Sequence, residues 1–123
     1  PVSCSAGLAV LDVIKEEKLQ ENAKNVGKYY LEKLNILKKK FNYIGDVRGS
    51  GLFIGIEIIN KDSKIPNTSL AQKIKNELRQ KRILVGTDGP YNNVIKSKPP
   101  ICLSKENVDE IISSLNLILQ KYG

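Results

Sequence analysis

Apolar residues recur at steps of three and four, the period of amphipathic helices, in four segments of this chain. Residues 1–17 carry Ala6, Val10, Val13 and Ile14 at this spacing. The second segment carries Leu19, Ala23, Val26, Tyr30, Leu34, Leu37 and Phe41. The third, which should end near Arg82, carries Leu70, Ala71, Ile74 and Leu78, and the last carries Val108, Ile111, Ile112, Leu115, Ile118, Leu119 and Tyr122. Each predicted helix has one face to bury.

Strand-forming residues fill three shorter segments between these helices. Residues 52–59 are rich in β-branched and aromatic side chains, and the glycine-rich segment 43–51 predicts a turn before them. Ile83–Val85 and Val94–Lys98 are two further short strands, separated by a turn-rich loop at 86–93. The order helix, helix, strand, helix, strand, strand, helix predicts an α+β fold: a small, mostly antiparallel sheet covered on one side by helices.

Polar residues predict where these elements begin and end. Ser69 followed by Gln72 is a capping-box pattern for the third helix, and Ser104 is an N-cap for the last. The cations Lys38–Lys40 complement the dipole at the end of the second helix. Pro99 and Pro100 should end the last strand.

The composition is that of one globular domain. The chain has 123 residues, of which 41% are apolar, and its charged residues are dispersed among the periodic apolar ones, which argues against disorder. No apolar run approaches the roughly 20 residues of a membrane span, and residues 1–9 lack the order of a signal peptide. We expect a soluble, cytoplasmic protein without a membrane partner.

Metal chemistry and histidine-based catalysis are not expected in this chain. It has no histidine, and Cys4 and Cys102 are its only cysteines, so no set of metal ligands is present. A disulfide between the two cysteines is one possibility. Because both have small or apolar neighbours, two reduced thiols in the core are the favoured interpretation.

The formal net charge of +7 raises the alternative of a non-catalytic, basic helical interaction domain that binds nucleic acid or a protein partner. The densest basic run, Lys38–Lys40, ends a predicted helix, and no basic stripe with interleaved aromatic residues accompanies it. A solvated face is the favoured interpretation, and nucleic acid is not an expected partner.

The glycines after Arg48 do not form a phosphate cradle. Gly49, Gly51 and Gly55 have the wrong spacing for a dinucleotide fingerprint and precede a strand instead of opening a helix. A structural turn is expected, in which Gly49 and Gly51 allow close backbone packing and Arg48 anchors the turn through hydrogen bonds.

Lys96 and Lys98 are the candidate binding residues. Alternate residues of a strand point to the same side, so two ammonium groups would face one spot and attract an anion. The other interpretation is a solvated edge strand, whose lysines discourage aggregation.

Three segments in sequence order resemble the class III aminotransferase family. Residues 1–11, PVSCSAGLAVL, resemble the sequence after the family's Gly-Gly-Asn turn, and residues 47–57, VRGSGLFIGIE, resemble its Arg-Gly-x-Gly-Leu strand. Residues 94–101, VIKSKPPI, are similar to the last strand, and residues 104–122 to the terminal helix. The resemblance covers almost the whole chain.

The resemblance implies a C-terminal small domain of a pyridoxal phosphate enzyme with fold type I architecture. Residues 1–17 would continue from a missing N-terminal large domain, and residues 18–123 would form the small domain. The full-length enzyme would be a homodimer acting on a small-molecule amine with pyridoxal phosphate. The isolated fragment would hold no cofactor and no catalytic residue, because the Schiff-base lysine would lie upstream.

One departure from the family bears on the substrate. Many members have an arginine at the position of Lys96, where it holds a substrate carboxylate. The combination of residues 87–90 with residues 93–100 looks more like the phospho-lyase branch, whose members act on phosphoethanolamine or phosphohydroxylysine. This resemblance favours phosphate elimination over transamination. Lys96 and Lys98 are then expected to position the phosphate, and the lip of the pocket is expected at Thr87, Asp88, Gly89, Pro90, Tyr91 and Asn92.

Overall fold

The computed structural model describes all 123 residues and contains four helices and four strands. The helices are α1 (Val2–Glu16), α2 (Leu19–Lys40), α3 (Thr68–Gln80) and α4 (Lys105–Gln120). The strands are β1 (Ile44–Ser50), β2 (Phe53–Ile58), β3 (Gly86–Asp88) and β4 (Val94–Ser97). They form one antiparallel sheet in the order β1-β2-β4-β3, which confirms the predicted α+β class.

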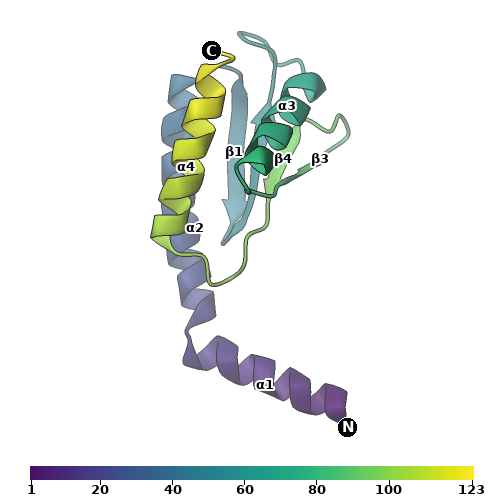
Figure 1. Cartoon of the computed structure of the whole chain (residues 1–123), viewed down its shortest axis with the longest axis vertical. Helices are drawn as coiled ribbons and strands as arrows, with labels where there is room; N and C mark the ends of the chain where they lie inside the picture. The colour runs from purple at the N-terminus through teal and green to yellow at the C-terminus, as the bar shows by residue number, and fades with distance from the viewer.

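Helices α2, α3 and α4 cover one side of the sheet (Figure 1). Every second residue of β2 is buried there, with Ile54 and Ile58 fully inaccessible and Ile56 3% exposed. The predicted apolar faces of the three helices join the same core, which contains 20 buried residues. The Tyr30 hydroxyl, also buried, donates to the Ser97 hydroxyl at 3.3 Å, and this bond ties α2 to β4. The opposite face of the sheet carries no helix.

Helix α1 extends away from this body (Figure 1). Lys18 adopts a left-handed conformation between α1 and α2, and its φ of 51° breaks what would otherwise be one long helix. No residue of α1 is buried, and Val2, Leu8, Val10, Leu11 and Val13 are all exposed. None of the helices combines the length and apolarity of a membrane span.

Two of the predicted strand boundaries were wrong. Residues 43–51 form mostly a strand and not a turn, because β1 pairs with β2 along its length and the turn is confined to the residues around Gly51, at φ 56°. Ile83–Val85 is an extended connection and β3 begins only at Gly86. In the register that pairs Gly86 with Lys96, Ile83 would fall opposite Pro99, which has no N–H to donate.

The cap of α3 and the environment of the cysteines also differ from the predictions. Asn67 caps α3 by accepting a hydrogen bond from the Leu70 amide, so Ser69 lies inside the helix and the predicted capping box does not form. Ser104 is confirmed as the N-cap of α4, where it forms a reciprocal capping box with Asn107. Cys4 and Cys102 are free thiols, but both are exposed because each lies outside the helix-covered core.

Candidate functional site

The uncovered face of the sheet presents side chains from all four strands. Antiparallel pairing places Arg48 of β1 and Lys96 of β4 on either side of Gly55 in β2. Because glycine has no side chain, a depression of about 500 Å³ opens over this position. Its lining is completed by Gly49, Phe53, Ile54, Asp88, Gly89 and Val94.

Lys96 and Lys98 converge beside this depression, as strand alternation predicts. The Lys96 ammonium lies 5.5 Å from the centre of the Phe53 ring, and the Lys98 ammonium lies 5.1 Å from the same centre. Phe53 is 54% exposed, Lys98 is exposed and Lys96 is partly exposed, so this contact lies at the surface. Contact with an aromatic face stabilises a cation, so the Phe53 ring is a common partner of both ammonium groups.

The Lys96 ammonium also forms an ion pair with Asp88. The other carboxylate oxygen of Asp88, Oδ1, accepts a hydrogen bond from the Gly89 backbone amide at 2.8 Å. Gly89 has a φ of 89°, a backbone conformation that favours glycine. Lys98 forms no ion pair. The pair of lysines therefore retains one uncompensated positive charge.

The predicted lip, residues 87–92, is divided between the two faces of the sheet. Asp88 and Gly89 line the depression, whereas Thr87 turns towards α3 and accepts a hydrogen bond from the Gln72 amide at 3.2 Å. Pro90, Tyr91 and Asn92 form the turn into β4 and do not line the depression. The Tyr91 carbonyl accepts the Thr68 hydroxyl, and the Asn92 φ of 48° closes the turn.

Arg48 was expected to anchor the turn through hydrogen bonds. Its guanidinium donates across the β1–β2 hairpin to Glu57 at 3.0 Å and within β1 to Asp46 at 3.1 Å, because all three side chains alternate onto the uncovered face. Hydrogen bonds raise the pKa of Arg48, the bond to Glu57 more than the bond to Asp46. Partial burial opposes ionisation of Asp46, but hydrogen bonds from Arg48 and Lys38 outweigh it and lower the pKa of that carboxyl.

The two turn glycines differ in what they require. A Cβ on Gly49 would lie 2.6 Å from the Phe53 carbonyl oxygen, whereas a Cβ on Gly51 would have its nearest neighbour at 3.8 Å and the left-handed φ is what favours glycine there. The sequence analysis did not identify Gly27, whose position on α2 leaves no room for a Cβ beside the Gly51 carbonyl. This approach fixes α2 against the β1–β2 turn, so these glycines hold the sheet in place.

Sequence reasoning also missed Phe53 and Asn93. Phe53 is the first residue of β2, and its alternation with Gly55 and Glu57 was the available signal for its place on the uncovered face. Asn93 is 3% exposed and donates its side-chain amide to the Ile58 carbonyl at 2.9 Å. That bond fixes the start of β4, and hence the position of Lys96, but no pattern in the sequence indicates it.

The domain thus combines a small antiparallel sheet, helices on one face and, on the other, a depression whose lining includes Arg48, Lys96 and Asp88. The comparisons with known proteins give the family. The model of the family described as "Aminotransferase class-III" matches residues 1–119. This chain belongs to the class III aminotransferase family.

Curated relatives include both aminotransferases and phospho-lyases. An "Alanine--glyoxylate aminotransferase 2-like" protein of Drosophila melanogaster is 49% identical over 91% of this chain. An "Ethanolamine-phosphate phospho-lyase homolog 1" of Caenorhabditis elegans is 37% identical over 97% of it. The chain covers 23% and 26% of these proteins respectively, so it spans about a quarter of their length.

Two solved structures contain this fold. A phospholyase from Arthrobacter in complex with phosphoethanolamine superposes with a TM-score of 0.94 at 37% identity, over 98% of this chain and 29% of that one. A PLP-bound amine transaminase from an uncultivated Pseudomonas species gives a TM-score of 0.87 at 32% identity, over all of this chain and 28% of that one.

The residues of this chain do not by themselves fit pyridoxal phosphate. The cofactor needs an imine-forming lysine, an acidic partner for its ring nitrogen and donors for its phosphate. In the depression Lys96 is paired with Asp88, and Arg48 is paired with Asp46 and Glu57. The lysine that lines the depression is therefore engaged by a carboxylate and is not free to form an imine. No group of three or more His, Cys, Asp or Glu side chains is placed to hold a metal ion.

Proposed function

We propose that residues 18–123 are the small domain of a larger pyridoxal phosphate enzyme, and that this chain alone catalyses no reaction. The first statement is supported by the length of the chain, which covers only about a quarter of the relatives named above. The second is supported by the residues of the uncovered face, which do not fit the cofactor. The remaining protein would then bind the cofactor and supply the imine-forming lysine.

Helix α1, within residues 1–17, then belongs to the surface that packs on the large domain. Its apolar side chains are exposed in this chain, with Leu8 64% and Leu11 62% accessible. Burying such side chains stabilises a contact between domains. A homodimer of the full-length protein in the cytoplasm is part of the same proposal and follows from the family resemblance.

We propose phosphate elimination from a phosphorylated amine as the reaction of the full-length enzyme. The observation that carries this choice is the convergence of Lys96 and Lys98 on one exposed ring beside the depression. A phosphate dianion that reached both ammonium groups would be bound by two positive point charges. The similarity to a phospholyase that was solved with phosphoethanolamine supports the same choice.

Transamination is the second candidate. The 49% identity to a protein named as an alanine–glyoxylate aminotransferase favours it. The two reactions differ in products, since elimination from phosphoethanolamine releases inorganic phosphate, whereas transamination passes the amino group to an acceptor.

In this proposal, Lys96 and Lys98 position the substrate phosphate, and the loop of residues 87–92 forms the rim. Asp88 and Gly89 would stand nearest the ligand, because both line the depression. Thr87 would act through the loop, since its hydroxyl is engaged by Gln72 on the other face. Pro90, Tyr91 and Asn92 would fix the shape of the turn.

The test compares both reactions in the full-length protein that carries this chain, supplied with pyridoxal phosphate. We expect phosphate release from phosphoethanolamine at a higher kcat/KM than amino transfer from alanine to glyoxylate. Amino transfer without phosphate release would establish the second candidate in its place. Absence of both activities, in a protein that binds the cofactor, would refute the assignment to either reaction.

A further inference from the structure

Lys98 follows the last residue of β4, where the sheet gives the chain little support. Ser97, the residue before it, pairs with Ile54 of β2 on one side, but the pairing of β4 with β3 on the other side stops at Lys96. The next residue, Pro99, has no N–H to donate to a strand. The direction of the Lys98 side chain therefore depends on how Ser97 is held.

Ser97 is held from the helix-covered side of the sheet by a buried pair of hydroxyl groups. The Tyr30 hydroxyl donates to the Ser97 hydroxyl at 3.3 Å, and Tyr30 is 1% and Ser97 5% exposed. Burial raises the pKa of Tyr30, so this hydroxyl keeps a proton to donate. Ile95, the other buried residue of β4, is apolar, and burying two hydroxyl groups costs free energy that an apolar pair would not. The hydroxyl pair therefore contributes a directional bond to this end of β4, which apolar packing lacks.

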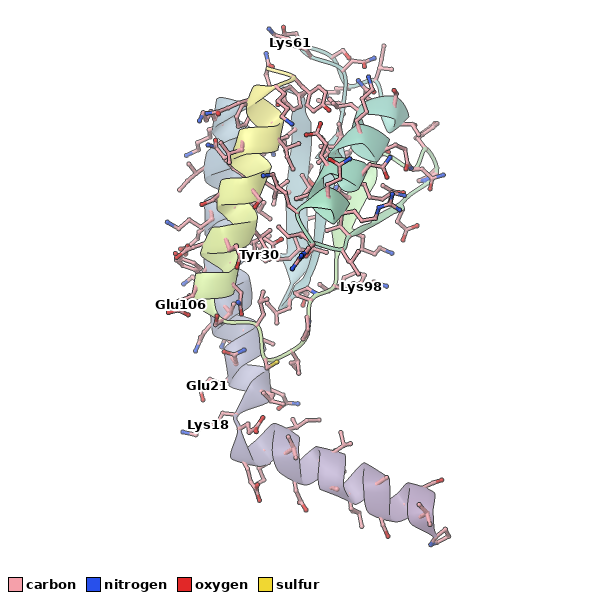
Figure 2. All side chains as sticks on the ribbon, in the orientation of Figure 1. Lys18, Glu21, Tyr30, Lys61, Lys98 and Glu106 are labelled. Atoms are coloured by element: carbon pink, nitrogen blue, oxygen red, sulfur yellow. The ribbon has the colours of Figure 1, made fainter.

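We infer that Tyr30 and Ser97 are positioning residues for Lys98, because their bond fixes the end of β4 from which the Lys98 side chain leaves the sheet. The Lys98 ammonium lies on the uncovered face, 5.1 Å from the centre of the Phe53 ring. Figure 2 shows Tyr30 on the helix side of the sheet and Lys98 near the lower end of the sheet. The effect on phosphate rests on the proposed function, whereas the contact of Lys98 with Phe53 does not require a ligand.

The substitution Tyr30→Phe removes the hydroxyl and keeps the buried ring, and Ser97→Ala removes its acceptor. Tyr43→Phe is the matched control, because Tyr43 is also buried and its hydroxyl donates to the Leu119 carbonyl of α4, without a bond to β4. Tyr30→Phe and Tyr43→Phe each lose one buried hydrogen bond, so a general loosening of the fold would affect both alike.

The first measurement is the dissociation constant of inorganic phosphate in the full-length holoenzyme, by calorimetry. We expect Tyr30→Phe and Ser97→Ala each to raise it by about threefold to tenfold, with Tyr43→Phe unchanged. The double variant should lose no more than either single variant, because both remove the same bond. Unchanged phosphate binding in Tyr30→Phe, or an equal loss in Tyr43→Phe, would overturn the positioning role.

A second measurement reports on Lys98 without any ligand. With 4-fluorophenylalanine at position 53 of the full-length protein, the fluorine resonance senses the ammonium beside the ring, and Lys98→Ala gives the resonance without it. We expect Tyr30→Phe, but not Tyr43→Phe, to move the resonance towards that of Lys98→Ala. A wild-type enzyme that binds no phosphate would refute the proposed function, and the fluorine resonance would still decide the positioning role, which an unmoved resonance in Tyr30→Phe overturns.

Discussion

Removal of the Lys96 ammonium is the sharpest test of the proposed site. A charge-assisted hydrogen bond contributes about 1.5–3 kcal/mol, which corresponds to roughly a ten- to hundredfold change in kcat/KM if the contact persists in the transition state. Because the ammonium must first leave Asp88, we expect Lys96→Ala to lie near the lower end of that range. Lys98→Ala should cost less, since Lys98 does not line the depression.

The assay compares kcat/KM for phosphoethanolamine with that for an unphosphorylated amino donor in the full-length enzyme. The phosphorylated substrate should lose about tenfold more than the other donor if Lys96 contacts phosphate. Lys61→Ala is the control for loss of a surface lysine, because Lys61 is exposed and lies at the top of the view in Figure 2, well away from Lys98. An equal loss on both substrates, or no loss on either, would refute the phosphate contact and return Lys96 to a solvated edge strand.

Three further predictions concern packing, pH and charge. Gly27→Ala should destabilise the full-length protein by about 1–3 kcal/mol in urea unfolding, because a Cβ at this position would lie 2.0 Å from the Gly51 carbonyl oxygen. Hydrogen bonds from Lys121 and Tyr122 lower the pKa of Glu77 from its ordinary 4.5, so the stabilisation by the Glu77 carboxylate is present above pH 4.5 and is lost as the pH falls through the lowered pKa. Glu77→Gln should therefore reduce the pH dependence of the free energy of unfolding below pH 4.5 in an acid-unfolding experiment. DNA binding should be weak and disappear near physiological salt in a filter-binding titration, since the positive charges are scattered; tight, sequence-selective binding would support the interaction-domain alternative.

Helices α2, α3 and α4 could be predicted because each has one buried face that contributes to its stability. The spacing of Tyr30, Leu34 and Leu37 carries that information locally, and all three are buried. Strand β1 could not, because Gly45 and Gly49 read as turn residues and the segment becomes a strand only by pairing with β2. Its stability depends on residues distant in sequence, which a local pattern does not record.

The candidate site was predictable to the extent that it depends on alternation. Alternation alone places Lys96 and Lys98 on one side, and their common contact with Phe53 agrees with it. The ion pair between Lys96 and Asp88 depends on the register of β3 against β4, which pairs Gly86 with Lys96. Because the predicted strand ended at Val85, that register, and the separation of Thr87 from Asp88, could not be derived.

The two faces of strand β2 have different roles, one in stability and the other in the proposed binding. Ile54, Ile56 and Ile58 lie in the core beneath the helices, and a truncation of any of them would remove buried contacts. Phe53, Gly55 and Glu57 face the depression or its rim, where neither Lys96 nor Asp88 belongs to the core. Substitutions of those two residues should therefore leave the free energy of unfolding within about 0.5 kcal/mol of the wild-type value. A change in kcat/KM or phosphate affinity in such variants then reports on the site and not on the fold.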